Sequence, residues 1–291
     1  MNLEDGVADL HLHTTASDGT STVNERVEQA TAIGLEAIAI TDHDCIDDSL
    51  DGRVANYGGL DVITGVEART DYDGVKVELL GYFVDPTNPT LASLLNRARN
   101  FRHERNVEII DRIDDETGLE LSYDEMQERA RGMVGRPHFA RRLVEEGVVE
   151  SVGAAFGQYL GDEGSCYVPM TRVDYRTAID AIHGAGGVTS IAHPGRIRSD
   201  EVGDIVRRFA DYGVDGIEVW YPYAEYPNMS IDFGEEADAL AAEHDLLRTG
   251  GSDCHDPGSD RLPIGSVHIQ RSNLDELRGR AGERRSFESA V

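Results

Sequence analysis

The chain has 291 residues, of which 40% are hydrophobic, and its 27 basic and 55 acidic side chains give a formal net charge of −28 at pH 7. This length permits one large domain or a domain with an insert, and the composition argues against a disordered chain. Lys76 is the only lysine, so 26 of the 27 basic residues are arginines. We therefore predict a halophilic protein that stays hydrated in concentrated salt; an ordinary acidic cytosolic protein is the alternative.

The composition also disfavours several kinds of partner and location. A chain this acidic is not expected to bind nucleic acid non-specifically, because such binding depends on neutralising phosphates. The first residues lack the basic and apolar regions of a signal peptide, and no apolar stretch approaches the about 20 residues of a membrane helix. Cys45, Cys166 and Cys254 are odd in number and form no C-x-x-C pair, which favours reduced thiols. We predict a cytoplasmic protein without a membrane or stable nucleic-acid partner.

Apolar, β-branched runs alternate with helical patterns along most of the chain. The predicted strands are 7–12, 37–41, 60–66, 75–84, 188–192, 216–220, 246–249 and 264–269. The predicted helices between them are 22–33, 175–183, 201–212 and 233–244. Strands that alternate with helices are typical of parallel sheets with helical crossovers, and seven or eight such strands favour a closed β/α barrel.

The stretch from 96 to 168 has no strand pattern and is typical of several helices. Residues 97–113 are amphipathic, Ser122-x-x-Glu125 matches a capping box, and a helical pattern over 136–146 stops at Gly147. We therefore expect an α/β barrel formed by residues 1–95 and 169–291, which holds any metal site. Residues 96–168 are expected to form an inserted small helical domain that binds substrate phosphate or acts as a lid.

The first predicted strand ends in Asp9-Leu10-His11-Leu12-His13. Strand periodicity places Asp9, His11 and His13 on one face, where two imidazoles can chelate a metal ion and the carboxylate can orient a ring. Two histidines on a polar barrel rim would explain this motif equally well if it stood alone.

Four further strand ends carry residues of the same kind, namely Asp42-His43-Asp44, Glu67, His193 and Asp253-Cys254-His255. Side chains at the carboxyl ends of barrel strands converge, and so many unpaired polar groups would be costly unless cations were bound. Imidazole and carboxylate ligands suit manganese, zinc or iron. Eight or nine ligands exceed the needs of one ion, and paired ions can share a hydroxide that attacks phosphorus. We predict a multinuclear site that hydrolyses a phosphoester.

Four motifs in this order, Asp9–His13, Thr41-Asp42-His43, His193-Pro194 and Ser252-Asp253-Cys254-His255, closely resemble the PHP (polymerase and histidinol phosphatase) family of metal-dependent phosphoesterases. The resemblance covers almost the whole chain and implies a distorted (β/α)7 barrel. One of the eight predicted strands must then be peripheral or a hairpin arm. The runs 60–66 and 75–84, joined by the turn 71–74, are the expected hairpin.

The resemblance also implies two or three divalent ions, with manganese expected and zinc or iron as alternatives. One ion would be held by His11, His13, Glu67 and Asp253, and Glu67 would bridge to a second ion bound by His193. A third ion would be held by Asp18, His43 and His255. Glu78 stands where relatives carry a histidine, and a carboxylate there would favour manganese over zinc.

A closer resemblance is to the subfamily of nucleoside 3′,5′-bisphosphate phosphatases and a related 5′→3′ exonuclease on short RNA. It rests on Gly135-Arg136-Pro137-His138-Phe139-Ala140 and on Tyr167-Val168-Pro169. It implies that Arg136 and His138 bind substrate phosphate, with Arg196 as a second candidate. His138 or His193 would protonate the leaving oxygen, and an arginine would neutralise the developing charge.

The expected substrate is therefore a small phosphorylated molecule, such as a nucleoside 3′,5′-bisphosphate, or a short RNA end. Two alternatives stay open. A histidinol-phosphate phosphatase would carry the same four motifs, and a non-catalytic module that binds metal or nucleotide would carry most of the ligands.

Overall fold

The computed structural model describes residues 6–130, 132–225, 232–256 and 262–288. It divides into a barrel unit, residues 1–96 and 172–291, and a helical unit, residues 97–171. The sequence prediction placed these boundaries after residues 95 and 168. Each unit has a hydrophobic core of its own.

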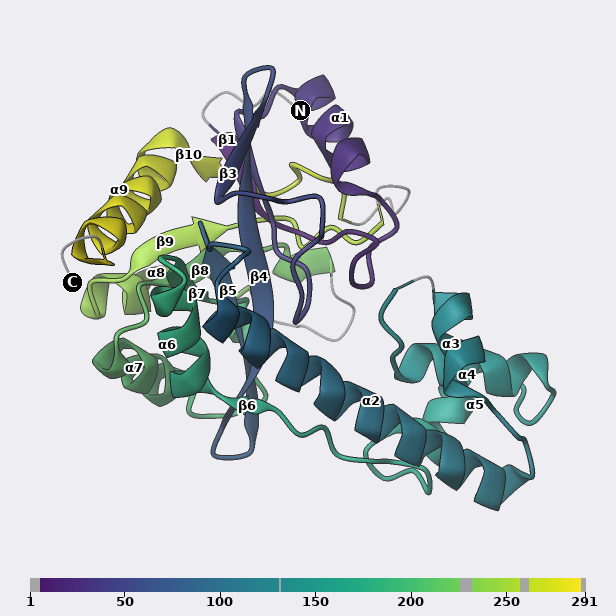
Figure 1. Cartoon of the computed structure of the whole chain (residues 1–291). Coiled ribbons are helices and arrows are strands. Elements are labelled where there is room, and N and C mark those ends of the chain that lie inside the picture. Colours follow the sequence, from purple (N-terminus) through teal and green to yellow (C-terminus); the bar gives the residue numbers. More distant parts are fainter. Residues whose placement is uncertain (1–5, 131, 226–231, 257–261, 289–291) are drawn as a thin grey trace. The chain divides into compact units, whose positions relative to one another are not determined.

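Seven of the described strands follow one another around a curved, nearly closed sheet in the barrel unit (Figure 1). Their order is β1 (Gly6–Leu12), β2 (Ala37–Ile40), β4 (Leu60–Tyr72), β5 (Val75–Tyr82), β7 (Val188–Ile191), β8 (Gly216–Trp220) and β9 (Leu247–Gly250). Beyond β9, Cys254 forms a parallel bridge with Leu12 at the end of β1, which brings the two edges of the sheet together. The predicted seven-stranded α/β barrel is confirmed.

The predicted hairpin is formed by β4 and β5, which pair antiparallel from Gly65 and Tyr82 to Tyr72 and Val75. Its turn is fixed by a hydrogen bond from Gly74 N to Asp71 Oδ2 of 2.9 Å. Because β5 also pairs antiparallel with β7, it is the reversed strand among parallel neighbours. Both arms of the hairpin are part of the barrel.

Three short strands extend this sheet: β10 (Ile269–Gln270) continues the strand order beside β1, whereas β3 (Val54–Tyr57) and β6 (Val173–Asp174) lie off it and pair with β4. The predicted strand 264–269 is wrong except for its last residue. Gly265 has φ 74° and donates its N–H to Asp9 Oδ2, so this apolar segment turns rather than extends. The sequence analysis also missed β3, whose alternating exposed and half-buried residues lack an apolar run.

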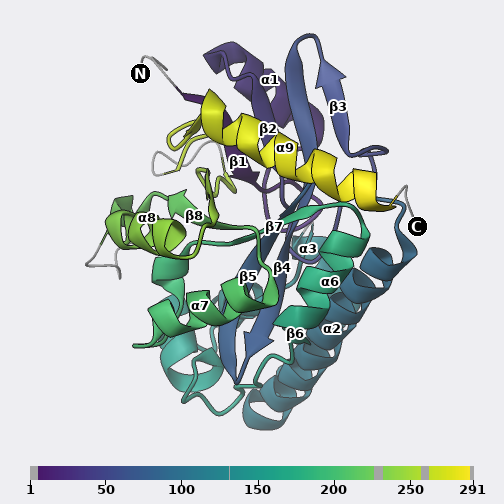
Figure 2. The ribbon, with the colours of Figure 1, turned by 90° about the vertical axis from the view of Figure 1, so that its left-hand side faces the viewer.

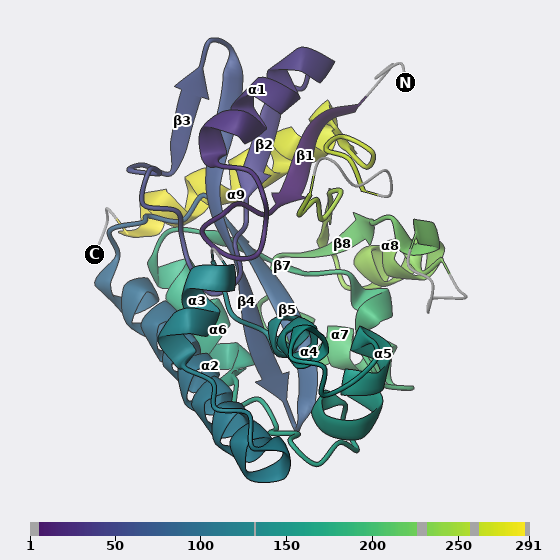
Figure 3. The same cartoon turned by 90° about the vertical axis from the view of Figure 1, so that its right-hand side faces the viewer.

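The predicted crossover helices are present as α1 (Val23–Ile33), α6 (Tyr175–Gly184), α7 (Val202–Tyr212) and α8 (Gly234–Glu243). Helix α1 begins with a capping box between Thr22 and Glu25, ends at Gly34 with φ 81°, and packs beside β2 (Figure 3). Helix α9 (Arg271–Glu288) was not predicted, because few apolar side chains interrupt its charged sequence. Leu274, Leu277 and Ala281 bury it against the barrel core (Figure 2).

The helical unit contains most of α2 (Pro89–Thr117), with α3 (Tyr123–Ala130), α4 (Arg136–Glu145), α5 (Val152–Ala155) and a π-helical turn (Phe156–Leu160). Helix α2 begins earlier and ends later than the predicted 97–113. The unit's core includes Ile113, Phe139 and Leu160. No helix in the described ranges is long and apolar enough to cross a membrane.

Asp215, just before β8, joins three other elements through one buried carboxylate. It accepts hydrogen bonds from His183 Nε2 on α6 at 2.9 Å and from Thr189 N on β7 at 2.9 Å. It also pairs with Arg280 and Arg284 on α9. Burial raises the pKa of Asp215, but the hydrogen bonds from His183 and Thr189 and the charge of Arg284 outweigh burial and hold it below its usual value.

We expect Asp215→Asn to lower the free energy of unfolding by about 2–4 kcal/mol at neutral pH, because charged hydrogen bonds are lost. A depressed folded-state pKa stabilises the fold above the unfolded pKa of about 4, and this stabilisation is lost as pH falls through the folded value. The difference between the two proteins should therefore shrink below about pH 4 in urea unfolding experiments. A difference that stays constant from about pH 7 to pH 3 would contradict this role.

Candidate metal centre

The residues predicted as metal ligands come together at one cavity of about 380 Å³ in the barrel unit. Seven of them line it: Asp18, His43, Glu67, Glu78, His193, Asp253 and His255. His11 and His13 are fully buried and contact Glu67 and Asp253. Most of these residues lie at or just beyond the end of a parallel strand, as the barrel geometry predicts, whereas Glu78 lies within the reversed strand β5.

The distances between potential ligand atoms match those between two atoms that bind the same metal ion. Two ligands that each bind one ion at about 2.1 Å lie about 3.0–3.4 Å apart at octahedral to tetrahedral angles. His13 Nε2 lies 3.1 Å and His11 Nε2 3.4 Å from Asp253 Oδ1. His255 Nε2 lies 3.3 Å from Asp18 Oδ1. These pairs are spaced to hold ions without large movements.

Four groups of ligand atoms, each mutually within 4.8 Å, can be drawn in this cluster. They are His11, His13 and Asp253; His11, Glu67 and His193; His43, Glu67 and Glu78; and His13, Asp18, His43 and His255. Glu67 takes part in two groups, which suits a bridging carboxylate. His13 belongs both to the group of His11 and to that of Asp18, whereas the family resemblance implied only the first.

Buried atoms without hydrogen bonds support a metal centre. Within the described chain, His11 Nε2, both ring nitrogens of His13, His43 Nδ1 and Glu67 Oε2 are buried and form no hydrogen bond. Each buried polar atom left without a partner costs about 1–3 kcal/mol, and native proteins contain few of them. These five atoms belong to residues of the ligand groups above, where coordination by divalent ions would satisfy them.

The electrostatics of the site keep His13, Glu67 and Asp253 in the form that binds metal. Burial, together with the charges of His255 and His43, lowers the pKa of His13 to about 3, so the ring is neutral. Burial raises the pKa of Glu67 and of Asp253, but the neighbouring histidine charges outweigh it and hold both well below the usual value.

His255 behaves differently from His13. Burial lowers its pKa, but the hydrogen bond to Asp18 and the charge of Asp253 outweigh burial and raise the pKa to about 9. The protonated ring supplies to Asp18 the positive charge that an ion would supply, so the cluster requires cationic charge in either form.

Asp9 does not orient a ligand ring, contrary to the expectation from strand periodicity. Its carboxylate accepts hydrogen bonds from Ser252 N at 2.9 Å, Ser252 Oγ at 2.6 Å and Gly265 N at 2.8 Å. It thereby fixes the backbone that leads to Asp253. The carboxylate is occupied by these neighbours, because it is buried and satisfies backbone groups that the sheet leaves unpaired.

Glu218 in β8 takes the orienting role, which the sequence analysis missed. Its Oε1 lies 3.0 Å from His11 Nδ1, so His11 presents Nε2 to the metal site. Its Oε2 accepts the backbone N–H of His193 at 2.7 Å, at a residue held at the unusual φ of 26°. An acidic residue within the apolar run 216–220 is the signal that could have identified it.

We expect Glu218→Gln to weaken metal binding by about 10- to 100-fold, because glutamine cannot accept from both His11 and His193. Isothermal titration with Mn²⁺ measures this loss. The exposed Glu243→Gln on α8 is a matched control that should bind as the wild type does. Equal Mn²⁺ affinities for the wild type and both variants would show that Glu218 does not support the metal ligands.

Arg26 on α1 also supports the ligands and was not predicted. Its side chain is fully buried, and it donates to His13 O from Nε and Nη2 at 3.0 and 2.8 Å. The same Nη2 donates to Cys254 O and His255 O at 2.9 and 3.0 Å. One guanidinium thus connects the chain after β1 to the chain after β9, which together carry four of the predicted ligands.

The three residues predicted to bind substrate lie in different units. Arg196 lines the metal cavity and donates to Asp253 Oδ2 at 3.1 Å and to Tyr221 Oη at 2.8 Å. Arg136 and His138 lie at the start of α4 in the helical unit. Arg136 donates to the Leu160 carbonyl at 3.0 Å and pairs with Asp162.

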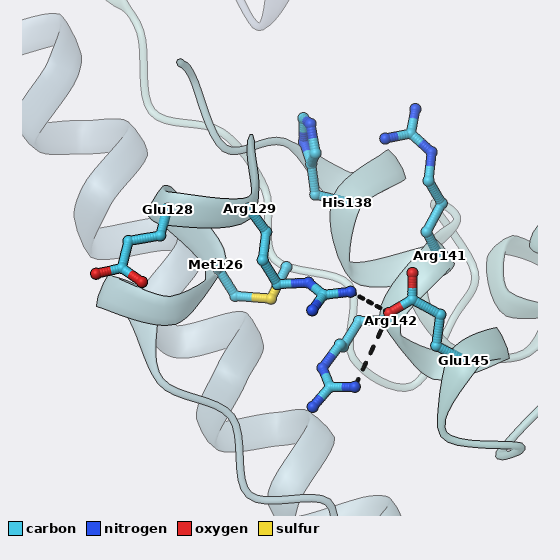
Figure 4. A pocket seen from close by; sticks show the side chains of 7 residues that line it. All are labelled: Met126, Glu128, Arg129, His138, Arg141, Arg142 and Glu145. Atoms are coloured by element: carbon cyan, nitrogen blue, oxygen red, sulfur yellow. Dashed lines mark hydrogen bonds and ion pairs between the residues drawn. The ribbon is translucent and has the colours of Figure 1, made fainter. Parts of the chain in front are cut away.

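His138 lines a separate cavity of about 320 Å³ within the helical unit, and its Nδ1 accepts the N–H of Gly135 at 3.1 Å. Arg129, Arg141 and Arg142 line the same cavity (Figure 4). Glu145 pairs with Arg129 and Arg142, whereas Arg141 and His138 extend to the other side of the cavity.

A strand-end cluster of histidines and carboxylates with orphaned ligand atoms, beside arginine and lysine side chains, has the composition expected of a metal-dependent phosphoester hydrolase. Known proteins agree. A model of the PHP domain matches residues 9–153. A 5′-3′ exoribonuclease of Haemophilus influenzae is 37% identical over 92% of this chain and 94% of its own. The chain belongs to the PHP family of metal-dependent phosphoesterases.

Two further relatives indicate the class of enzyme. A 3′,5′-nucleoside bisphosphate phosphatase of Chromobacterium violaceum is 31% identical over 88% of this chain and 90% of its own. The crystal structure of a predicted metal-dependent phosphoesterase from Bifidobacterium adolescentis superposes with a TM-score of 0.74. It covers 94% of this chain and 96% of its own at 30% identity. The chain is a hydrolase of phosphoester bonds.

Proposed function

We propose that the chain removes a phosphate from a nucleotide-like phosphomonoester, such as a nucleoside 3′,5′-bisphosphate, or acts at the 5′ end of short RNA. The observation that carries this is the single cavity lined by seven of the nine potential ligands, Glu67 among them, with His11 and His13 buried in contact with Glu67. The choice of a nucleotide is supported by the names of the relatives, an exoribonuclease and a bisphosphate phosphatase.

The ligands would be His11, His13, Asp18, His43, Glu67, Glu78, His193, Asp253 and His255. Two or three divalent ions bound by them would supply positive charge to the phosphate and lower the pKa of water. We propose manganese, because four of the nine ligands are carboxylates and oxygen ligands suit this metal better than zinc.

The roles of binding the phosphate and assisting the leaving oxygen are assigned to side chains that can donate hydrogen bonds. Arg196 is already at the cavity, where its fork can bind phosphate oxygens. His193 Nε2 faces Glu67 Oε1 at 2.9 Å, which suits a ligand more than a proton donor. His138 Nδ1 accepts a hydrogen bond from the Gly135 N–H, so the neutral ring carries its hydrogen on Nε2, from which it would donate a hydrogen bond to the leaving oxygen. Arg136 would bind a substrate phosphate after release from Asp162.

The net charge of −28 does not oppose an anionic substrate. Arg69, Lys76 and Arg196 line the metal cavity, and bound divalent ions would dominate the potential there. In molar salt the screening length falls to about 3 Å, so distant acidic residues hardly repel the substrate.

A substrate panel tests the proposal. Metal-loaded protein is assayed with adenosine 3′,5′-bisphosphate, short 5′-phosphorylated RNA and histidinol phosphate, each at low and about 2 M KCl. We expect hydrolysis of the nucleotide or RNA with Mn²⁺, and higher activity in high salt. Preference for histidinol phosphate would replace the proposed substrate, and metal binding without turnover of any phosphoester would favour a non-catalytic module.

A further inference from the structure

The only lysine of the chain lies at the metal cavity. Lys76 is on β5, lines the cavity and pairs through Nζ with Glu78 Oε2 at 2.6 Å. Its side chain is 44% exposed, whereas that of Glu78 is 3% exposed. An anion that enters the cavity from solvent therefore meets the ammonium group before it meets the buried ligands.

The carboxylate that holds Lys76 is also one of the potential ligands. Glu78 Oε2, the oxygen next to Lys76, lies 3.6 Å from His193 Nε2. The other oxygen, Oε1, accepts from Arg69 Nε at 3.1 Å. The ammonium group is thus one contact away from the ligand cluster, and Glu78 keeps a second cationic partner if Lys76 moves.

Within the ion pairs of Arg69 and Lys76, the charges are matched without a bound ion. Asp44 and Glu78 together face Arg69 and Lys76, two negative charges against two positive. Once Glu78 also binds a divalent ion, its charge is matched by that ion and by Arg69. The charge of Lys76 is then in excess, and an anion beside the metal ions would restore the balance.

The residue type supports the same role. This chain uses arginine at the other 26 basic positions, including Arg69 and Arg196 in the same cavity. A purely structural ion pair on Glu78 could be formed by arginine as well. Lysine differs by placing a compact charge with three donors on a flexible stem, which can turn from a carboxylate to a phosphate oxygen.

We propose that Lys76 leaves Glu78 when metal ions are bound and binds the phosphate group of the substrate beside them. The proposal rests on the proposed function, since it names a further residue of that phosphate site. Lys76 is a binding residue in this account, and it neither holds a metal ion nor transfers a proton.

Variants at position 76 test the contact. Lys76→Met should raise the inhibition constant of inorganic phosphate and the KM of the phosphomonoester by about 10- to 100-fold, and Lys76→Arg should recover part of the loss. Metal affinity and the melting temperature of the metal-free protein should change little, because Arg69 still pairs with Glu78. Arg207→Met, an exposed arginine on α7, is the control for removing one positive charge.

Chemical modification gives a second test that needs no turnover. Lys76 and the terminal amine are the primary amines that acetic anhydride can acetylate, and mass spectrometry separates them from each other and from acetylated tyrosines. We expect inorganic phosphate to protect Lys76 in the Mn²⁺-loaded protein but not in the metal-free protein. Lys76→Arg, which retains only the terminal amine, is the control for loss of activity on acetylation.

These measurements separate the two proposals. An unchanged phosphate inhibition constant in Lys76→Met, or absence of protection in the Mn²⁺-loaded wild type, would overturn the role of Lys76 while the phosphatase function stands. A wild type that hydrolyses no phosphoester would count against the proposed function, and protection by phosphate would still decide whether Lys76 contacts the anion.

Discussion

Replacing Glu67 by glutamine should reduce kcat/KM for a phosphoester by about 10³-fold or more and lower the number of bound metal ions. Glu67 is fully buried and lies between four histidines: His193 Nε2 is 2.9 Å and His11 Nε2 3.6 Å from Oε1, and His43 Nδ1 is 2.6 Å and His13 Nε2 3.6 Å from Oε2. Glutamine keeps the shape but has one acceptor oxygen and no charge, so it cannot bridge two ions.

Metal content after dialysis, measured by plasma mass spectrometry, and steady-state kinetics on the same sample check this prediction. Glu243→Gln again serves as the exposed control. The melting temperature of metal-free Glu67→Gln should fall, because the histidine charges that hold the pKa of Glu67 well below its usual value lose their partner. Full metal content together with near-normal activity would show that Glu67 is not the central ligand.

The second large effect is expected for Arg26→Met. The substitution removes the donors that satisfy the carbonyls of His13, Cys254 and His255, and we expect a loss of about 3–5 kcal/mol in the free energy of unfolding. Arg26→Lys should lose less stability than Arg26→Met, because the lysine ammonium can still donate to some of these carbonyls. Metal affinity should fall in the same order, since the segments that carry His13 and His255 are no longer joined.

Urea unfolding of the metal-free proteins and Mn²⁺ titration of the folded proteins separate the two effects. Arg207→Met is the matched control, since it removes an arginine of α7 that contacts only exposed acidic residues of its own helix. A variant at position 26 that is destabilised but binds Mn²⁺ normally would limit Arg26 to a structural role.

Much of the ligand cluster could be predicted because several ligands end or closely follow an apolar run in the sequence, whereas Asp18 and Glu78 were assigned through the family resemblance. His193 and Asp253 come just after β7 and β9, so a barrel topology brings them together without knowledge of side-chain packing. Glu67 required only that the run 60–66 be a strand. The physical basis is local. The alternation of side chains along a strand decides on which face of the sheet a residue lies, and parallel pairing brings the carboxyl ends of the strands to the same end of the barrel.

The residues that support the ligands could not be found in this way. Arg26 lies in a helix whose pattern gives no reason to bury a guanidinium, and its partners are carbonyls from distant segments. Glu218 lies inside an apolar run, and its role depends on the ring of His11 across the barrel. The prediction of a strand over 264–269 failed because the chain turns at Gly265, which donates its N–H to Asp9, and only Ile269 of this segment lies in a strand.

The arrangement of the residues proposed to bind substrate also could not be predicted from patterns in the sequence. Arg196 follows a ligand directly, and the structure places it at the metal cavity. Arg136 and His138 were assigned through a motif in the helical unit, and their contact with substrate stays a prediction. Lys76 stood out in the composition alone, and its position at the cavity became apparent only once β4 and β5 were paired.

The central claim is that the buried histidines and carboxylates form a multinuclear metal centre that hydrolyses a phosphoester. The most direct test titrates metal-depleted protein with Mn²⁺ and measures, in the same samples, bound metal and the initial rate with adenosine 3′,5′-bisphosphate. We predict that activity is absent without metal and rises as two or three ions bind per chain. Full activity in the metal-free protein, or saturation at a single ion, would contradict the account.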